Sequence, residues 1–302
     1  MITRRNKIQL WEELKIESIT RIISLIYATA LLVFFTRVQF NIIGRQQYAE
    51  YLLEGLDHLG GNNNGQKRTN EFSSTESIEH QIINEQYLLF NWWLVNRGWG
   101  GIVKGVRSSV QQVFHDINPR QELSFQNVYD LIKRVQSLVD YPSLPGHQNK
   151  KRYASFLLPP KELETFIIAQ GMGVADIYEP NFVNTKNLQG GSDSVPDIYP
   201  ELQIHDYLRC LLDETTKLTE SLSAIKVIDS LISSGLDVFL AQVADGSYKF
   251  NDTDSLLNNT GNTRDDQTLD IDIQVDTEKK VMDGSPDLNT LCAMLYSNIN
   301  ID

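Results

Sequence analysis

Apolar residues dominate one long segment near the start of the chain. Between Lys7 and Ile43 there is neither proline nor glycine, with Asn6 placed as an N-cap and Gly44 as the first residue beyond the helix. The middle of this segment is apolar almost all round, which a helix tolerates only when other helices cover it. The pattern therefore predicts one long central helix over residues 7–43.

Helical spacing recurs along the rest of the chain, between stretches rich in glycine, proline and asparagine. Gly98, Gly100 and Gly101 are expected to end one helix, and Ser124 is placed to cap another. The expected helices cover residues 46–56, 78–99, 102–115, 125–139, 203–243 and 288–296. With no repeat and few convincing strands, the pattern predicts an all-α fold, a bundle of long helices around a central apolar helix with flexible polar loops.

Three polar segments interrupt the expected helices. Residues 57–77 include a run of glycine and asparagine, and residues 182–198 are rich in glycine, asparagine and serine. Residues 251–287 carry ten acidic residues against three basic ones. We expect these segments to be flexible loops of a single helical domain that spans residues 1–302.

Charge and composition argue against several classes of function. The chain of 302 residues has 27 Lys+Arg and 39 Asp+Glu, a net charge of -12, which is the wrong sign for electrostatic binding to nucleic acid. Its two cysteines, Cys210 and Cys292, form no disulfide framework, and its five histidines show no metal-binding spacing. No set of acid, base and nucleophile converges in the sequence, so neither enzymatic activity nor a cofactor is expected.

One segment raises the question of a membrane span. The apolar run Ile22–Thr36 has 15 residues, a helix of about 22 Å against a hydrocarbon layer of about 30 Å. Extending the run to Ile43 brings Arg37 into the hydrocarbon, at about 2.5–3.5 kcal/mol for a central arginine. A buried core helix is the favoured interpretation, and the alternative is a single-pass membrane protein, or a generic helical adaptor, that uses residues 22–43 as a span or partner helix.

The first turns of the long helix carry the candidate binding residues. Trp11, Leu14 and Lys15 are spaced i, i+3 and i+4, so they project from one face, and Lys7 and Ile8 lie one turn earlier. An apolar platform edged by ammonium groups suits an amphipathic partner helix that inserts apolar anchors while its acidic residues meet the lysines. From spacing alone, the favoured interpretation is the alternative one, in which Trp11 is a core residue and Lys15 a solvated one.

The segment Leu10–Ile16 (LWEELKI) resembles the peroxin-3 family, the docking factors of peroxisomal membrane biogenesis. The resemblance continues through Leu32–Gly44 (LVFFTRVQFNIIG), Asn84–Tyr87 and Trp92–Leu94. It is weaker in the remaining chain, where the order and pattern of segments support it more than identity does.

This resemblance implies a mostly helical, non-enzymatic domain on the cytosolic face of the peroxisomal membrane. The family partner is peroxin-19, the import receptor and chaperone of peroxisomal membrane proteins, whose N-terminal amphipathic helix docks in a groove. The family's receptor-binding tryptophan matches Trp11, and the neighbouring leucine and lysine match Leu14 and Lys15. The expected partner-binding residues are therefore Trp11, Leu14, Lys15, Lys7 and Ile8.

Two further expectations follow from the resemblance. Fungal members also anchor factors for peroxisome inheritance and pexophagy, and the Trp92–Trp93 block is more similar to those members than to animal ones. Family members carry an N-terminal membrane anchor and a further helical stretch before the tryptophan-containing block. Only six residues precede Lys7 in this chain, so no anchor is evident in it.

Overall fold

The computed structural model describes six stretches of the chain, and all of the regular structure within them is helical. They are residues 4–59, 70–118, 121–140, 153–171, 204–245 and 279–297. The prediction of an all-α fold is confirmed. The chain divides into two compact units: residues 1–34, 99–152 and 222–290 form the first, and residues 35–98, 153–221 and 291–302 form the second.

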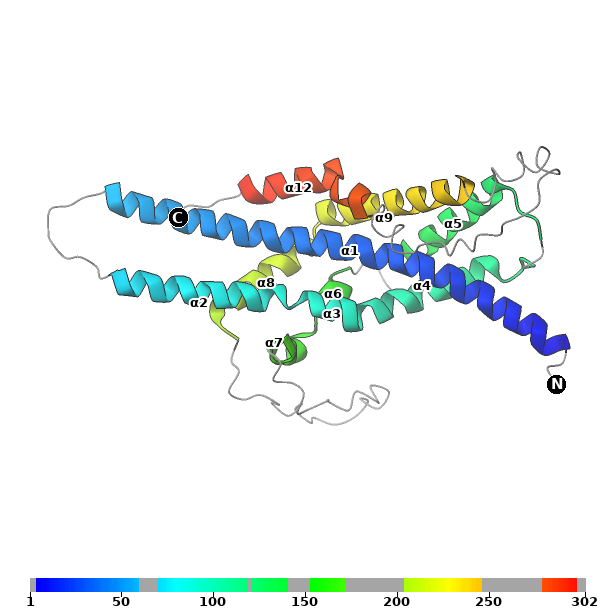
Figure 1. Cartoon of the computed structure of the whole chain (residues 1–302), viewed down its shortest axis with the longest axis horizontal. Coiled ribbons are helices and arrows are strands. Elements are labelled where there is room, and N and C mark those ends of the chain that lie inside the picture. Colours follow the sequence, from blue (N-terminus) through cyan, green and yellow to red (C-terminus); the bar gives the residue numbers. More distant parts are fainter. Residues whose placement is uncertain are drawn as a thin grey trace, which may run out of the picture. The chain divides into compact units, whose positions relative to one another are not determined.

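The longest element, α1 (Arg4–Leu59), is the blue helix of Figure 1 and contributes its first half to one unit and its second half to the other. The predicted end at Gly44 and the separate helix over 46–56 are wrong, and so is the N-cap at Asn6, because the helix runs from Arg4 without a break. A helical glycine costs only about 1 kcal/mol relative to alanine. Packing outweighs that cost, since Ile43 is buried and a Cβ at Gly44 would lie 3.6 Å from the Tyr296 ring.

The apolar positions of α1 are largely buried in the two units. Over Lys7–Leu52 the helix is long and apolar enough to cross a membrane, a criterion that the core helix of a folded protein also meets. Ile23, Ile26, Tyr27, Leu31 and Phe34 belong to the core of the first unit, and Phe35, Val38 and Ile42 to that of the second.

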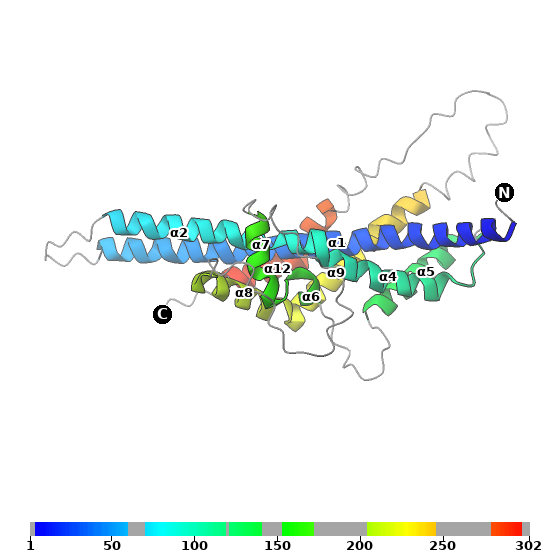
Figure 2. The same cartoon turned by 90° about the horizontal axis from the view of Figure 1, so that it is seen from below.

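Three further helices build most of the first unit. They are α4 (Trp99–Phe114), α5 (Phe125–Asp140) and α9 (Leu222–Val243). In Figures 1 and 2, α4 runs antiparallel to the first half of α1. α5 is the next helix after α4 along the chain. The prediction that Gly100 and Gly101 end a helix is wrong, because both lie inside the first turn of α4.

Side-chain hydrogen bonds connect these helices. The buried Tyr27 of α1 donates to Asp140 Oδ1 at 2.9 Å, and burial raises the pKa of this tyrosine above its ordinary value. Gln136 Nε2 donates to Ser233 Oγ at 2.9 Å, which joins α5 to α9. The predicted N-cap is confirmed, because Ser124 Oγ accepts from the backbone N–H of residue 127 at 3.3 Å.

The second unit combines the second half of α1 with short helices. They are α2 (Asn70–Leu88), α3 (Asn91–Trp93), a wide π-type turn (Leu94–Gly98), α6 (Ala154–Leu157), a 3₁₀ turn (Lys161–Leu163), α7 (Glu164–Gly171) and α8 (Asp206–Thr219). α2 runs antiparallel alongside α1 in Figure 2. The helix expected over 78–99 is therefore interrupted, first at the turn Leu89–Phe90 and again at the wide turn.

A buried polar network holds α1, α2 and α8 of this unit together. Gln39, which is fully buried, donates from Nε2 to the carbonyl oxygen of Tyr87 at 2.7 Å and accepts from Asn91 Nδ2 at 2.6 Å. The Tyr87 hydroxyl pairs with Thr215 Oγ1 at 2.5 Å, and burial raises the pKa of Tyr87. Buried polar groups with partners, as here, fix the relative register of neighbouring helices.

The structure confirms some of the remaining predictions of helices and loops and differs from others. The helical pattern over 203–243 is two helices, α8 and α9, with a break at Glu220–Ser221, and the last helix is α12 (Pro286–Ser297) as expected. The loop expected over 57–77 is helical at 57–59 and 70–77, and residues 279–287 of the acidic segment hold a helical turn and the start of α12. Residues 60–69, 182–198 and 251–278 lie outside the described residues.

Candidate partner-binding site

Three of the five candidate residues form an exposed apolar surface at the start of α1, and a fourth, Lys7, lies at its edge. Ile8, Trp11 and Leu14 keep 61%, 60% and 54% of their surface exposed, and Lys7 is exposed beside them. Leu10, which is 54% exposed, extends the same surface. The interpretation of Trp11 as a core residue is therefore wrong, and the platform expected from the spacing lies open to solvent.

The fifth candidate, Lys15, is engaged within its own unit. Its Nζ donates to the carbonyl oxygens of Phe114 at 2.9 Å and Ile117 at 2.5 Å, and it pairs with Glu12 Oε2 at 2.6 Å. These three acceptors use the three N–H donors of an ammonium group. A lysine at the carboxyl end of a helix also stabilises the helix dipole. Lys15 therefore fastens the end of α4 to α1 and is not the solvated lysine that spacing alone allowed.

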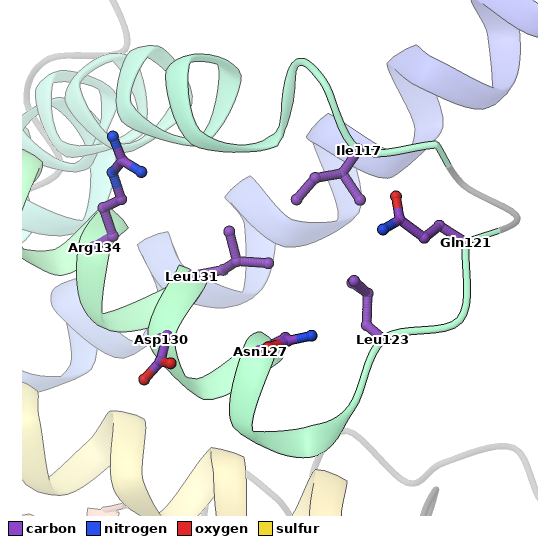
Figure 3. A pocket seen from close by; sticks show the side chains of 7 residues that line it. All are labelled: Ile117, Gln121, Leu123, Asn127, Asp130, Leu131 and Arg134. Atoms are coloured by element: carbon purple, nitrogen blue, oxygen red, sulfur yellow. The ribbon is translucent and has the colours of Figure 1, made fainter.

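Ile117, whose carbonyl oxygen Lys15 binds, is one of the residues that line an open pocket of about 320 Å³ (Figure 3). Ile117 and Gln121 come from the connection between α4 and α5, and Leu123 directly precedes α5. In Figure 3 the side chains of Ile117, Leu123 and Leu131 point toward the same opening. The complete lining is Ile117, Gln121, Leu123, Asn127, Asp130, Leu131 and Arg134.

Lys15 links the α1 surface to the pocket, because it lies on the same helix as Trp11 and binds the backbone of one pocket residue. It follows Trp11 by one helical turn, and its ammonium group binds the carbonyl of Ile117 in the pocket wall. The apolar side chains of the pocket suit one bulky apolar anchor, and the exposed Arg134 and Asp130 supply charge at its rim. Together the two features offer a surface on which an amphipathic helix can place several anchors.

Sequence spacing gave no sign of this pocket, because it forms only where the connection between α4 and α5 folds against α5. The usable signal was weak: Ile117 and Leu123 are apolar residues in an otherwise polar connection between two helices. Sequence did place the exposed residues on one helical face. It missed that Lys15 is bound by backbone carbonyls about 100 positions away.

Metal-binding chemistry has no support in the part of the chain that the structure describes. No group of three or more His, Cys, Asp or Glu side chains there could hold a metal ion.

Comparisons with known proteins agree on one family. The model of the family described as Peroxin-3 matches residues 1–281. The chain is similar to "Peroxisomal biogenesis factor 3" of Yarrowia lipolytica, 35% identical over 80% of this chain and 53% of that protein. It is also similar to "Peroxisomal membrane protein PEX3" of Komagataella phaffii, 32% identical over 61% and 45%, and to "Peroxisomal biogenesis factor 3" of Bos taurus, 26% identical over 59% and 45%. The chain thus spans about half the length of the curated relatives it matches.

Proposed function

The chain belongs to the peroxin-3 family, and from this we propose that it acts in peroxisome membrane biogenesis as a docking receptor at the cytosolic face of the peroxisomal membrane. Its ligand is the N-terminal amphipathic helix of peroxin-19, the receptor that carries peroxisomal membrane proteins. Docking recruits the loaded receptor to the organelle and requires no covalent chemistry.

The observation that carries this proposal is the exposed apolar surface of α1. Trp11 and Leu14 stand on the same face, each more than half exposed, and tryptophan is enriched among the residues that dominate binding energy. A partner helix that lies on this face can insert one further apolar side chain into the pocket around Leu131. Lys7 and Arg134 are the exposed cations that can meet the acidic residues of the partner, and Lys15 acts by holding the pocket wall.

A membrane-spanning role for residues 22–43 competes with this proposal. The length and composition of α1 allow it. In the fold, however, Tyr27 bonds to α5, and Ile26 lies against Gly235 of α9. Inserting the helix into a bilayer would break these contacts. We also propose that the chain anchors factors for peroxisome inheritance and pexophagy. The resemblance to fungal family members is the only support for this role.

Calorimetric titration of the full chain with the N-terminal peptide of peroxin-19 tests the proposal. We expect saturable binding that Trp11→Ala weakens by about 2 kcal/mol or more, because a central aromatic anchor is lost. Trp99→Ala is the matched control, since Trp99 is 48% exposed in the same unit but lies on α4. Unimpaired binding by Trp11→Ala would reject the site, and a folded wild-type chain that does not bind would reject the partner.

A further inference from the structure

The exposed apolar residues of α1 continue past the proposed docking surface. Trp11, Leu14, Ser18, Ile22 and Leu25 are all exposed, with 38% and 40% of the surface accessible at Ile22 and Leu25. At about 100° per residue they fall within roughly 80° of the helix circumference. We call these five residues the α1 stripe. It lies entirely within the first unit.

The spacing of the α1 stripe is the same in both directions. Its intervals are 3, 4, 4 and 3 residues, centred on Ser18. If a second copy lay antiparallel with Ser18 opposite Ser18, Trp11 would face Leu25 and Leu14 would face Ile22. A twofold interface requires such self-complementarity, because each contact occurs twice. The small central serine allows two helices to approach at the short end of the usual 8–10 Å range.

Charge along one edge of the stripe is also self-complementary. Glu17 and Arg21 lie on the same flank of α1, one and three positions from the centre on opposite sides of it. In the antiparallel pair, Arg21 of one copy lies within two residues, about 3 Å along the axis, of Glu17 of the other. Glu17 also pairs with Arg107 of its own chain, and this pair is half exposed, so the carboxylate stays accessible. The pairing gives two cross-copy ion pairs.

We propose that the α1 stripe is a homodimer interface, in which α1 packs antiparallel against α1 of a second copy with Ser18 at the twofold axis. Four apolar side chains per copy make a small interface, at the low end of the range for specific association, so the dimer is weak and concentration-dependent. Because the stripe includes Trp11 and Leu14, the second copy and the proposed partner helix exclude each other. This competition, unlike the dimer itself, rests on the proposed function.

Sedimentation velocity of the full chain over rising concentrations tests the dimer. We expect the wild-type sedimentation coefficient to rise with concentration and that of Ile22→Glu to stay at the monomer value. Leu222→Glu is the matched control, an apolar residue of the same unit that is 78% exposed on α9, and it should dimerise like wild type. Leu25→Glu replaces Ile22→Glu if the latter fails to fold. A wild-type chain that stays monomeric, or an Ile22→Glu chain that dimerises, would overturn the proposal.

Cysteine cross-linking tests the register. In a chain with Cys210→Ser and Cys292→Ser, Ser18→Cys should form a disulfide-linked dimer on mild oxidation, because the two Cα atoms lie opposite each other. Ser108→Cys, exposed on α4, is the control. Cross-linking of Ser18→Cys no faster than that of Ser108→Cys would contradict the twofold register.

Peptide titration separates this inference from the proposed function. Ile22→Glu should still bind the peroxin-19 peptide, since Ile22 lies outside the proposed docking residues. A wild-type chain that stays monomeric and binds the peptide overturns the dimer alone. A wild-type chain that dimerises, together with a monomeric Ile22→Glu chain that does not bind the peptide, overturns the docking proposal alone.

Discussion

The Lys15 ammonium has three N–H donors, and three acceptors from its own unit surround it. They are the carbonyl oxygen of Phe114 at the end of α4, that of Ile117 in the connection after it, and the Glu12 carboxylate. Only 12% of its side chain is exposed. Hydrogen bonds from a charged donor contribute about 1.5–3 kcal/mol to stability when the partners would otherwise stay unpaired. In the proposed docking, Lys15 would therefore act indirectly, by holding Ile117 of the pocket wall in place.

Replacing this lysine should cost stability. We expect Lys15→Met to lower the free energy of unfolding by about 1–3 kcal/mol, because the carbonyl oxygens of Phe114 and Ile117 lose their donor. Lys7→Met is the matched control, since Lys7 is exposed on the same helix, and it should stay within about 0.5 kcal/mol of wild type. Urea denaturation measures both. A Lys15→Met chain as stable as wild type would show that the three contacts contribute nothing.

At the scale of single residues, sequence predicted where side chains point better than what they touch. The i, i+3, i+4 spacing placed Trp11, Leu14 and Lys15 on one face, which follows from helical geometry alone. Whether that face is open depends on which helices pack nearby, so Trp11 could not be assigned to the core or the surface by spacing. The acceptors of Lys15 are set by the tertiary fold and lie beyond any local pattern.

At the scale of helices and turns, the glycines show where tertiary packing overrides the local tendency of glycine to end a helix. Gly44 and Gly100 lie within helices that sequence signals would end there. Gly98 has a different role, because a Cβ at this position would lie 2.1 Å from the backbone oxygen of Phe156. The close approach of the wide turn to α6 therefore requires glycine.

Alanine substitution separates these roles. We expect Gly98→Ala to lower the free energy of unfolding by about 2 kcal/mol or more, since two backbone segments of the second unit must move apart. Gly100→Ala should instead raise it by up to about 1 kcal/mol, because no atom lies within 4 Å of the added Cβ and alanine favours the helix. Thermal or urea unfolding of both variants checks the contrast. Equal effects would contradict the packing argument.

Helix boundaries agree with the sequence prediction where a local capping residue sets them. They differ from the prediction where contacts with another segment set them. α5 begins where Ser124 caps it, as the sequence predicted. The wide turn at Leu94–Gly98 has no local breaker before Gly98, and it forms where this segment packs against α6. Such a turn cannot be located from periodicity, because its cause lies in another segment.

At the scale of the whole molecule, the apolar side chains in the middle of α1 are mostly buried within the two units of the protein. Fully buried side chains lie on it in both units, among them Ile26, Leu31, Phe35 and Val38. The all-α fold class was predictable because helical spacing dominates the chain and strand alternation is scarce. The division into two compact units was not, because α1 continues through both of them.

Carbonate extraction tests whether α1 acts as a membrane span. We expect these 302 residues, expressed with membranes present, to be released by alkaline carbonate, because burying α1 in lipid would remove the core of both units. A known integral membrane protein is the control for retention. Retention of this chain in the carbonate pellet would favour the alternative that residues 22–43 span the bilayer.

Hydrogen exchange of the full chain with and without the N-terminal peptide of peroxin-19 tests the docking site most directly. The peptide should slow exchange in residues 7–15 and 114–134, which contain the exposed surface of α1 and the pocket, and leave α2 and α8 unchanged. Slowed exchange elsewhere with none in these two segments would contradict the site. No change at saturating peptide would contradict docking itself.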